Sequence, residues 1–404
     1  MNAMPRVFVD KVVDDLYVLR VDDDRTRFFE ALWEIEEGIT YNAYLLLTGE
    51  GAVVFDGWKK WFSELFLEKI REIVDYGDIR YVVVHHAEPD HSGSVPDVLR
   101  VSEKAVALGH PIAGRMLSSF YGVTRFRPVK DGEELKVGER SIHFVYTPWL
   151  HWPETIMSYL RDDGVLLSCD AFGSYSVPAL YDESVENFEK LAWFIKKYYV
   201  TVIGHYSPHV LKALEKLGSL GVKPRIIAPS HGTIFRRNAE RILDEYRRIA
   251  LGEPVKGKAV VVYVSMYGFV ERLVSLAIEE LSQRGFETRV YAFTDTSRPR
   301  ISDILGELAD AELLVLGGAT YEAGVQPVLD YVVRLIAEKL EYRSDKLAVL
   351  LLSSYGWAGT AGKLVAEALK GHGFQRVSSV EVQGYAPENV KENLKKALDS
   401  LLSL

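Results

Sequence analysis

The sequence of 404 residues contains one cysteine, Cys169, and only 6 asparagines and 4 glutamines. One cysteine excludes an intramolecular disulfide, a zinc ribbon and any iron–sulfur or rubredoxin centre that four thiolates would hold. Such scarce cysteine is typical of a cytoplasmic protein. The shortage of thermolabile amides, beside abundant Glu, Lys and Arg, predicts a protein from a hot environment.

Long apolar runs and basic clusters are also absent from the sequence. No uninterrupted apolar run reaches the roughly 18 residues that span a bilayer. The N-terminal segment carries Asp10, Lys11, Asp14 and Asp15, so we expect neither a signal peptide nor a membrane span. The net charge of −9, from 48 Lys and Arg against 57 Asp and Glu, has the wrong sign for binding phosphate backbones and argues against a nucleic-acid partner.

The composition that is present belongs to a large globular protein. Hydrophobic residues at 48% and charged residues at 26% are ordinary values, and a chain of this length predicts two or three domains. Segment 251–257 combines Gly, Pro and charge without periodicity, as linkers do. We therefore expect one domain over residues 1–250 and another over 258–404. Nine of the ten histidines lie before residue 232, so the two halves carry different chemistry.

The first half has short strands and helices in mixed order. Residues 41–56 and 157–168 each place a turn between two apolar stretches, which predicts two β-hairpins. Helical patterns over 61–74 and 185–198 interrupt these strands. We expect strands covered by helices.

The second half alternates strands and helices regularly. Its strands are continuous Val/Leu runs, which predicts a parallel sheet buried on both faces, with the size and order of a flavodoxin-like fold. The predicted strands are 259–264, 288–293, 312–316, 347–352 and 377–382, and the predicted helices are 271–284, 301–308, 328–339, 361–370 and one from residue 388.

A dense group of potential metal ligands follows the apolar run 81–84. Four ligand-type side chains occur within six positions: His86, Glu88, Asp90 and His91. If the backbone stays extended past the strand, the first three point to one side and His85 to the other. A helix starting near Ser94 would leave His91 on the intervening turn.

Three more candidates each lie near the end of an apolar strand: His151, Asp170 and His231. Seven ligands suit two metal ions if one carboxylate bridges them, which leaves open positions for water or substrate. We interpret the remaining side chains as surface, hydrogen-bonded or packing residues, with His205 left between a packing and a pocket role; these are His85, His110, His143, His209, His372 and Cys169. For Cys169, a regular strand would turn the thiol away from Asp170.

The motif His86-x-Glu88-x-Asp90-His91, followed by His151, Asp170 and His231, resembles that of the metallo-β-lactamase fold family, in the variant where Glu replaces the second motif histidine. Joined to a flavodoxin-like domain, this variant resembles the flavodiiron proteins over essentially the whole chain. Residues 149–155 and 355–357 strengthen the resemblance. It implies an α/β fold, with an N-terminal metallo-β-lactamase-like αββα sandwich and a C-terminal flavodoxin-like doubly wound parallel sheet.

The resemblance also implies a catalytic diiron centre. One iron would take His86, Glu88 and His151, the other Asp90, His91 and His231, with Asp170 between them. A carboxylate in place of an imidazole is a harder donor, which favours iron over zinc.

The same resemblance implies an FMN site at the carboxyl ends of the second domain's strands. Its predicted residues are Ser265, Met266, Tyr267, Gly268, Phe269 and Val270, then Gly318, Ala319, Thr320 and Tyr321, then Ser354, Tyr355, Gly356, Trp357, Ala358 and Gly359. The first loop departs from the flavodoxin pattern, because Phe269 and Val270 stand where hydroxyl side chains are usual. The phosphate would then be held mostly by backbone amides.

The function implied is reduction of O₂ to water or of NO to N₂O, with electrons passing through FMN from a separate donor. That donor would be rubredoxin or a reduced deazaflavin, and the assembly a head-to-tail homodimer or a homotetramer. Two alternatives remain open: a dizinc hydrolase with an accessory flavodoxin domain, and an electron carrier whose first domain only docks partners.

Overall fold

The computed structural model describes residues 5–403 and divides the chain into two compact units. One comprises the residues up to 199 together with 208–247, and the other comprises 200–207 and the residues from 248 onward. Within residues 5–403, no helix combines the length and apolar character needed to cross a membrane.

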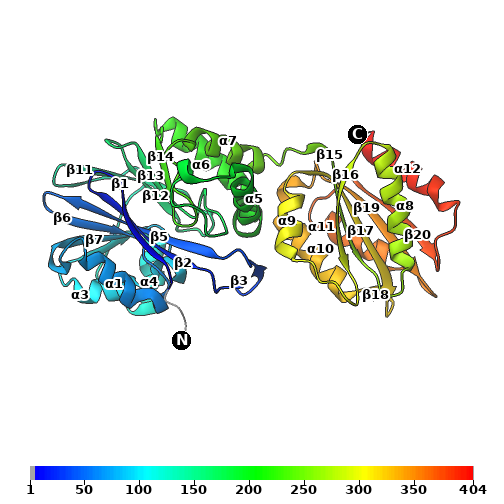
Figure 1. Ribbon diagram of the computed structural model, residues 1–404, viewed down its shortest axis with the longest axis horizontal. Coiled ribbons are helices and arrows are strands. Elements are labelled where there is room, and N and C mark those ends of the chain that lie inside the picture. The colour runs from blue at the N-terminus through cyan, green and yellow to red at the C-terminus, as the bar shows by residue number, and fades with distance from the viewer. Residues whose placement is uncertain (1–4, 404) are drawn as a thin grey trace. The chain divides into compact units, whose positions relative to one another are not determined.

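The first unit is a sandwich of two β-sheets (Figure 1). The larger sheet has seven strands in the order β1 (Val7–Val13), β2 (Leu16–Asp23), β5 (Ile39–Thr48), β6 (Gly51–Phe55), β7 (Ile79–Val84), β8 (Val106–Gly109) and β9 (Phe126–Pro128). The smaller sheet runs β10 (Glu134–Val137), β11 (Arg140–Tyr146), β12 (Ile156–Leu160), β13 (Val165–Cys169) and β14 (Ile226–Pro229). Apolar side chains of both sheets form one buried core, with Val18 and Phe55 from the first and Phe144 and Leu167 from the second.

Both predicted hairpins are present in this sandwich. Strands β5 and β6 pair antiparallel around the turn at 49–50, and β12 and β13 pair antiparallel around the turn at 161–164. Strands β6 to β9 are parallel to one another, and β14 is parallel to β13. The carboxyl ends of β7, β13 and β14 can therefore all carry functional loops.

Helices cover the outer faces of the sandwich, as Figure 1 shows. Contacts place α1 (Ser63–Arg71), α3 (Val95–Val101) and α4 (Pro111–Tyr121) against the larger sheet. Beside the smaller sheet lie α5 (Phe188–Tyr198), α6 (Ser207–Ser219) and α7 (Ala239–Ala250). A small hairpin of β3 (Phe28–Phe29) and β4 (Trp33–Glu34) stands apart from both sheets.

The second unit is a doubly wound parallel sheet. Its strands lie in the order β16 (Glu287–Phe293), β15 (Val255–Val264), β17 (Ala311–Tyr321), β19 (Ala348–Tyr355) and β20 (Val377–Gln383), all parallel. In chain order this is 2-1-3-4-5, the flavodoxin topology. The sequence predicted all five strands, and the flavodoxin-like fold is confirmed.

Helices pack on both faces of this sheet (Figure 1). On one face, α8 (Phe269–Gln283) contacts α12 (Val390–Leu402), and on the other α10 (Pro327–Lys339) contacts α9 (Ile301–Leu308) and α11 (Ala361–Gly371). The first strand begins earlier than predicted, because Val255 already pairs with Ala311 across a bulge. Residues 255–257, predicted as linker, therefore belong to β15.

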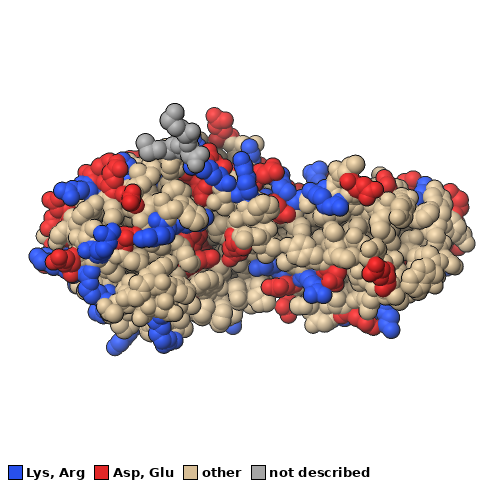
Figure 2. All heavy atoms as spheres, turned by 90° about the horizontal axis from the view of Figure 1, so that it is seen from below, with Lys and Arg blue, Asp and Glu red and all other residues tan. Residues whose placement is uncertain are grey.

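Charged side chains are interspersed over the face shown in Figure 2, with Lys and Arg next to Asp and Glu. Elsewhere in the structure, charged side chains form ion pairs such as Lys216 with Asp131 at 2.6 Å and Arg284 with Asp399 at 2.7 Å. On this face the net negative charge is therefore spread out and does not form one acidic patch.

Candidate metal centre and flavin site

The structure brings all seven predicted metal ligands together at the strand ends of the first unit. His86 follows β7, Asp170 follows β13 and His231 follows β14. His151 lies in the connection between β11 and β12. Strand ends from both sheets thus supply one cluster.

One local prediction about this cluster is wrong. The backbone does not stay extended to Asp90, because a short helix, α2 (Pro89–Ser92), begins directly after Glu88. Proline suits the first position of a helix, since its fixed φ is helical and its missing N–H is not needed there. Helix α3 does begin after Ser94, but the Ser94 hydroxyl accepts a hydrogen bond from the Trp58 N–H instead of capping the helix.

The seven side chains form two groups of donor atoms that meet at Asp170. Donor atoms of the first group lie within 4.8 Å of one another, as do those of the second; the groups are His86, Glu88, His151 and Asp170, and Asp90, His91 and His231. Asp170 Oδ1 lies 3.0 Å from His91 Nε2 and 3.2 Å from His231 Nε2. Asp170 Oδ2 lies 3.5 Å from His86 Nε2 and 3.6 Å from His151 Nε2. One carboxylate oxygen therefore faces each group.

Several of these donor atoms lack any hydrogen-bond partner in the part of the chain that the structure describes. Four donor atoms are buried and have no hydrogen-bond partner among the described residues: both oxygens of Asp90, Oδ2 of Asp170 and Nε2 of His231. Buried polar atoms normally have a partner, since leaving one unsatisfied costs about 1–3 kcal/mol or more. Converging lone pairs of carboxylates and imidazoles fit two bound cations.

Hydrogen bonds on the far side of two imidazoles fix which nitrogen faces the cluster. His86 Nδ1 lies 2.7 Å from Oε1 of the fully buried Glu154, and His231 Nδ1 lies 2.7 Å from the carbonyl oxygen of Thr40. A carbonyl oxygen only accepts, so His231 Nδ1 must carry the proton and Nε2 is left as a lone pair toward the cluster. Metal-binding histidines usually have this arrangement.

The sequence did not reveal three residues that support the cluster. Glu154 holds His86 and also accepts from the Ala87 N–H at 3.0 Å. The buried Tyr198 hydroxyl donates to Asp170 Oδ1 at 2.9 Å. Glu154 lies three residues after His151, which is a usable signal, whereas the Thr40 carbonyl carries no side-chain signal at all.

Electrostatics within the cluster shift its pKa values strongly. Burial alone raises the pKa of Glu88 and of Asp170, but the neighbouring histidines outweigh burial and lower both. Burial alone lowers the pKa of His91, but the carboxylates of Asp90 and Asp170 raise it to about 9. The pKa of His86 is likewise raised, by Glu154 and Glu88 against burial. Without metal, protons on these imidazoles balance the carboxylates.

The other histidines lie outside the cluster. His85 is buried and bonds through Nδ1 to Asp56 Oδ2 at 2.6 Å and through Nε2 to Ser158 Oγ at 2.7 Å. This network joins the larger sheet to β12 directly beneath His86. The remaining five have separate surroundings: His110 caps α4, His143 lies on β11, His205 Nδ1 lies 3.2 Å from the Glu338 carbonyl, His209 is near Trp149, and His372 ends α11.

Cys169 lies nearer the cluster than a regular strand would allow. Its φ of 53° is left-handed, and the β13–β14 register is irregular between Leu167 and Cys169. As a result, the sulfur lies within 4.8 Å of donor atoms of His91 and Asp170. Burial and the charge of Asp170 raise the pKa of this thiol, which keeps it protonated in the metal-free cluster.

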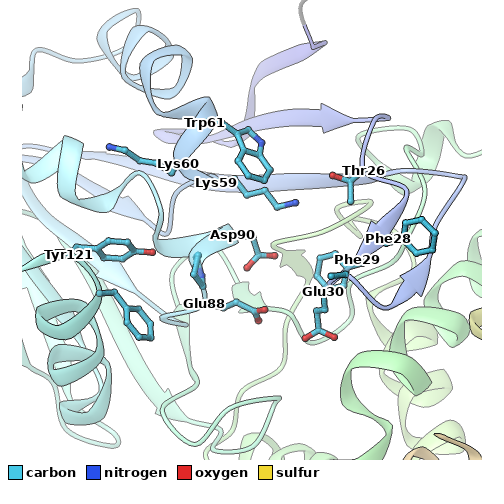
Figure 3. Close-up of a pocket in the computed structure, with 13 residues that line it drawn as sticks. Thr26, Phe28, Phe29, Glu30, Lys59, Lys60, Trp61, Glu88, Asp90 and Tyr121 are labelled. Atoms are coloured by element: carbon cyan, nitrogen blue, oxygen red, sulfur yellow. The ribbon is translucent and has the colours of Figure 1, made fainter. Parts of the chain in front are cut away.

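A cavity of about 570 Å³ opens beside Glu88 and Asp90. Figure 3 shows both carboxylates and the Lys59 amine pointing toward it. Lys59 Nζ lies 4.7 Å from the Tyr41 ring centre and 5.1 Å from that of Trp61. Burial lowers the pKa of Lys59 against the opposing charges of Asp90 and Asp23. The cavity is thus a route to the cluster, and its lining includes two lysines, Lys59 and Lys60.

The predicted flavin loops surround a smaller cavity of about 230 Å³ in the second unit. Ten predicted residues line it, together with Gly384, which was not predicted; they are Ser265, Met266, Tyr267, Phe269, Val270, Ala319, Thr320, Ser354, Tyr355 and Gly356. A Cβ on Gly356 or Gly268 would meet no atom within 4 Å, so the backbone there is open to a ligand. These features fit a planar flavin held by backbone and small side chains.

Six predicted residues do not line this cavity. A Cβ on Gly318 would meet Leu329 and one on Gly359 would meet Glu381, so these glycines serve packing. Tyr321 and Trp357 are exposed on the surface, at 41% and 77%. The other two are Gly268 and Ala358.

Comparisons with known proteins agree with both units. The family described as ODP family beta lactamase matches residues 39–232, and the flavodoxin family matches residues 261–396. The nitric oxide reductase of Moorella thermoacetica is 30% identical over 366 residues, 89% of each chain. The rubredoxin-oxygen oxidoreductase of Megalodesulfovibrio gigas is 28% identical over 395 residues, 95% of each chain.

A solved structure of a flavo di-iron protein from Thermotoga maritima, a single-residue variant, superposes with a TM-score of 0.92 at 39% identity and covers 100% of this chain and 99% of that one. Both units and their order along the chain are therefore those of these relatives. The chain belongs to the flavodiiron protein family.

Proposed function

We propose that this oxidoreductase reduces O₂ to water or NO to N₂O at two iron ions held by the histidine–carboxylate cluster, with electrons passing through FMN in the second unit. Asp170 carries this proposal, because one of its oxygens faces each donor group. We assign His86, Glu88 and His151 to one iron and Asp90, His91 and His231 to the other. Glu88 adds a hard oxygen donor, which favours iron over zinc.

When bound, FMN and two ferrous ions would together store four electrons, the number that reduces O₂ with four protons to two waters. Two NO molecules need only two electrons and two protons to give N₂O and water. The chain's own residues hold and shield this chemistry. Glu154 and Thr40 orient His86 and His231, and Tyr198 supplies a hydroxyl to Asp170. Phe29 packs 6.0 Å from the His231 ring, which limits water on that side.

We propose that the electrons come from a separate donor protein or cofactor. Rubredoxin is one candidate, since it is named in the Megalodesulfovibrio relative, and a reduced deazaflavin is the other. The flavin would lie in the cavity lined by Ser265, Ala319, Thr320, Ser354 and Tyr355.

We further propose a head-to-tail homodimer, alone or paired into a tetramer. Exposed aromatic residues stand around the mouth of the metal cavity: Phe28 at 57%, Trp61 at 71% and Phe120 at 46%. The flavin loops expose Tyr267 at 83% and Trp357 at 77%. Two such apolar sets on one chain fit a two-fold, isologous dimer in which each copy's flavin loops lie against the other copy's metal cavity.

The proposed function is tested by anaerobic reduction of the iron- and FMN-loaded chain, followed by rapid mixing with O₂ and, separately, with NO. We expect fast reoxidation by one gas, with water or N₂O as product and no peroxide. The control is the zinc-loaded chain, whose reduced flavin should be reoxidised by O₂ only slowly and with peroxide as the product, and which should form no N₂O from NO. A different set of results would instead establish a hydrolase. These are two zinc ions in the protein as purified, no reaction of the iron-loaded chain with either gas, and turnover of a thioester or phosphodiester.

The variant Glu154→Gln replaces a buried carboxylate with an amide. It should bind iron about 10- to 100-fold more weakly, because the side chain that orients His86 loses its charge. The measurement is iron per chain after competition with a chelator. Glu103→Gln, on the exposed surface, is the matched control and should bind iron as the unmodified chain does. Equal iron retention in the two variants would contradict the role given to Glu154.

Metal binding should release protons at neutral pH. The pKa of His91, raised to about 9, and that of His86, also raised, keep both imidazoles protonated at pH 7 in the metal-free chain, whereas Glu88 and Asp170, with lowered pKa, are already ionised. Metal cations must displace these imidazole protons, so the affinity of the cluster for metal should rise as the pH is raised from 7 to above 9. Adding metal to the weakly buffered apoprotein should release about two protons at pH 7 and almost none near pH 10.

The head-to-tail arrangement can be tested by complementation. Asp170→Ala should disable the metal site, and Gly356→Trp should fill the flavin cavity, so each variant alone should be inactive. Mixed after dissociation and reassociation, they should recover roughly a quarter of the unmodified rate, because half of the dimers then pair one intact flavin with one intact metal site. No recovery in a mixture that forms dimers would contradict the arrangement.

A further inference from the structure

His85, the residue directly before the ligand His86, is completely buried, and its polar atoms are all hydrogen-bonded. Its N–H donates to Asp56 Oδ1 at 2.8 Å, and its ring Nδ1 lies 2.6 Å from Asp56 Oδ2. On the other side of the ring, Nε2 lies 2.7 Å from Ser158 Oγ. The His85 carbonyl oxygen accepts from the Ile156 N–H at 3.0 Å. The position of His85 is therefore fixed through both its backbone and its ring.

The partners of His85 come from both sheets of the first unit. Asp56 directly follows β6 in the larger sheet, whereas Ile156 and Ser158 lie on β12 in the smaller sheet. The Phe55 ring stacks on the imidazole, with 5.8 Å between the ring centres and 11° between the ring planes. His85 therefore joins the two sheets at the point where the chain leaves β7.

The side chains of Asp56, His85 and Ser158 are connected in the order of the groups that activate a serine nucleophile in hydrolases. If the imidazole donates to Asp56 through Nδ1, its Nε2 can accept from the Ser158 hydroxyl. Burial excludes nucleophilic catalysis, because the exposed fractions of the three residues are 1%, 0% and 0%. A substrate cannot reach the Ser158 hydroxyl. These three residues therefore act through what they hold in place.

The chain segment that His85 contacts also carries a metal ligand. Glu154, two residues before β12, lies 2.7 Å from Nδ1 of His86 and accepts from the Ala87 N–H at 3.0 Å. The ligand His151 lies three residues before Glu154. Displacing β12 from the end of β7 would therefore move His151 relative to His86.

Two imidazoles of the first donor group depend on this spacing. The Nε2 atoms of His86 and His151 lie 3.4 Å apart, and they lie 3.1 and 2.9 Å from Glu88 Oε2. The second donor group has other supports, because the Thr40 carbonyl holds His231 and its other two members lie on α2. The contacts of His85 thus act more directly on one metal position than on the other.

We propose that His85 is a positioning residue that sets the spacing of His86 and His151, and thereby controls the occupancy of one of the two metal positions. The inference rests on the metal centre of the proposed function, but not on which metal binds there. Loss of the groups that orient a ligand weakens metal binding about 10- to 100-fold. Loss of the bond between His85 and Ser158 should weaken the first donor group by this amount and leave the second unchanged.

The test is anaerobic loading of the full-length, metal-free chain with Fe²⁺, followed by competition with a chelator and measurement of iron per chain. His85→Asn keeps a donor for Asp56 but is too short to reach Ser158, and Ser158→Ala removes the same bond from the other side. At a chelator concentration that leaves two irons in the unmodified chain, each variant should retain about one. The visible absorption of the Co²⁺-loaded variants, which depends on coordination geometry, should lose the bands of one site.

Two controls separate positioning from a general effect on the fold. The double variant of His85→Asn with Ser158→Ala should lose no more iron than either single variant, because both changes remove the same bond. His372→Asn, at the exposed end of α11, is the matched control and should retain both irons. Thermal unfolding of the metal-free variants shows how much of any loss comes from a weaker fold, because that cost appears without metal as well.

Retention of both irons in His85→Asn and Ser158→Ala would overturn the inference and leave the proposed function intact. Loss of both irons together would overturn it as well, because His85 would then support the whole cluster. If the unmodified chain binds zinc and not iron, the iron of the proposed function fails, and the same counts made with Zn²⁺ decide the inference. A chain that binds neither metal would overturn both. The count in Ser158→Ala is decisive even if His85→Asn does not fold.

Discussion

The stability of the first unit depends on how the negative charge of its buried carboxylates is neutralised. Glu88, Asp90 and Asp170 lie among four imidazoles, and several of their oxygens have no hydrogen bond in the described chain. Uncompensated burial of such charges costs several kcal/mol each. Protons on His86 and His91 balance part of the charge in the metal-free state, and bound metal cations would balance it more fully. Metal occupancy and the stability of this end of the sandwich are therefore linked.

The same constraint explains why the supporting residues come from both sheets. His231, after β14, is held by the Thr40 carbonyl of β5, and His86, after β7, is held by Glu154 ahead of β12. The buried pair of His85 and Ser158 adds a third link between the sheets. Closing the sandwich thus also sets the direction of the ligands, so the geometry of the cluster does not depend on flexible loops alone.

The sequence predicted which side chains gather in the cluster better than it predicted their surroundings, for a physical reason. Ligands must be His, Asp or Glu at strand ends, and strands are readable from apolar runs. Their supports are backbone carbonyls or residues remote in sequence, as with His231 and Thr40, which are 191 positions apart. Local conformation was also missed where proline began α2 and where Cys169 took a left-handed φ. Pro89 is itself a residue-type signal for the start of α2. The conformation of Cys169 follows the irregular β13–β14 pairing more than its residue type.

For the flavin cavity, the sequence predicted the location better than the chemistry. Its place was predictable, because a 2-1-3-4-5 parallel sheet brings the loops after β15, β17 and β19 to one edge. Its ligand selectivity was harder to predict, because backbone amides would do most of the binding there, and nearly every residue type carries the same amide. Only departures in side chains, such as Phe269 and Val270, distinguish one such loop from another. The chemistry of a buried charged cluster can therefore be predicted from its residue types. The chemistry of a cavity lined by backbone can be predicted only from the side chains that its loops lack.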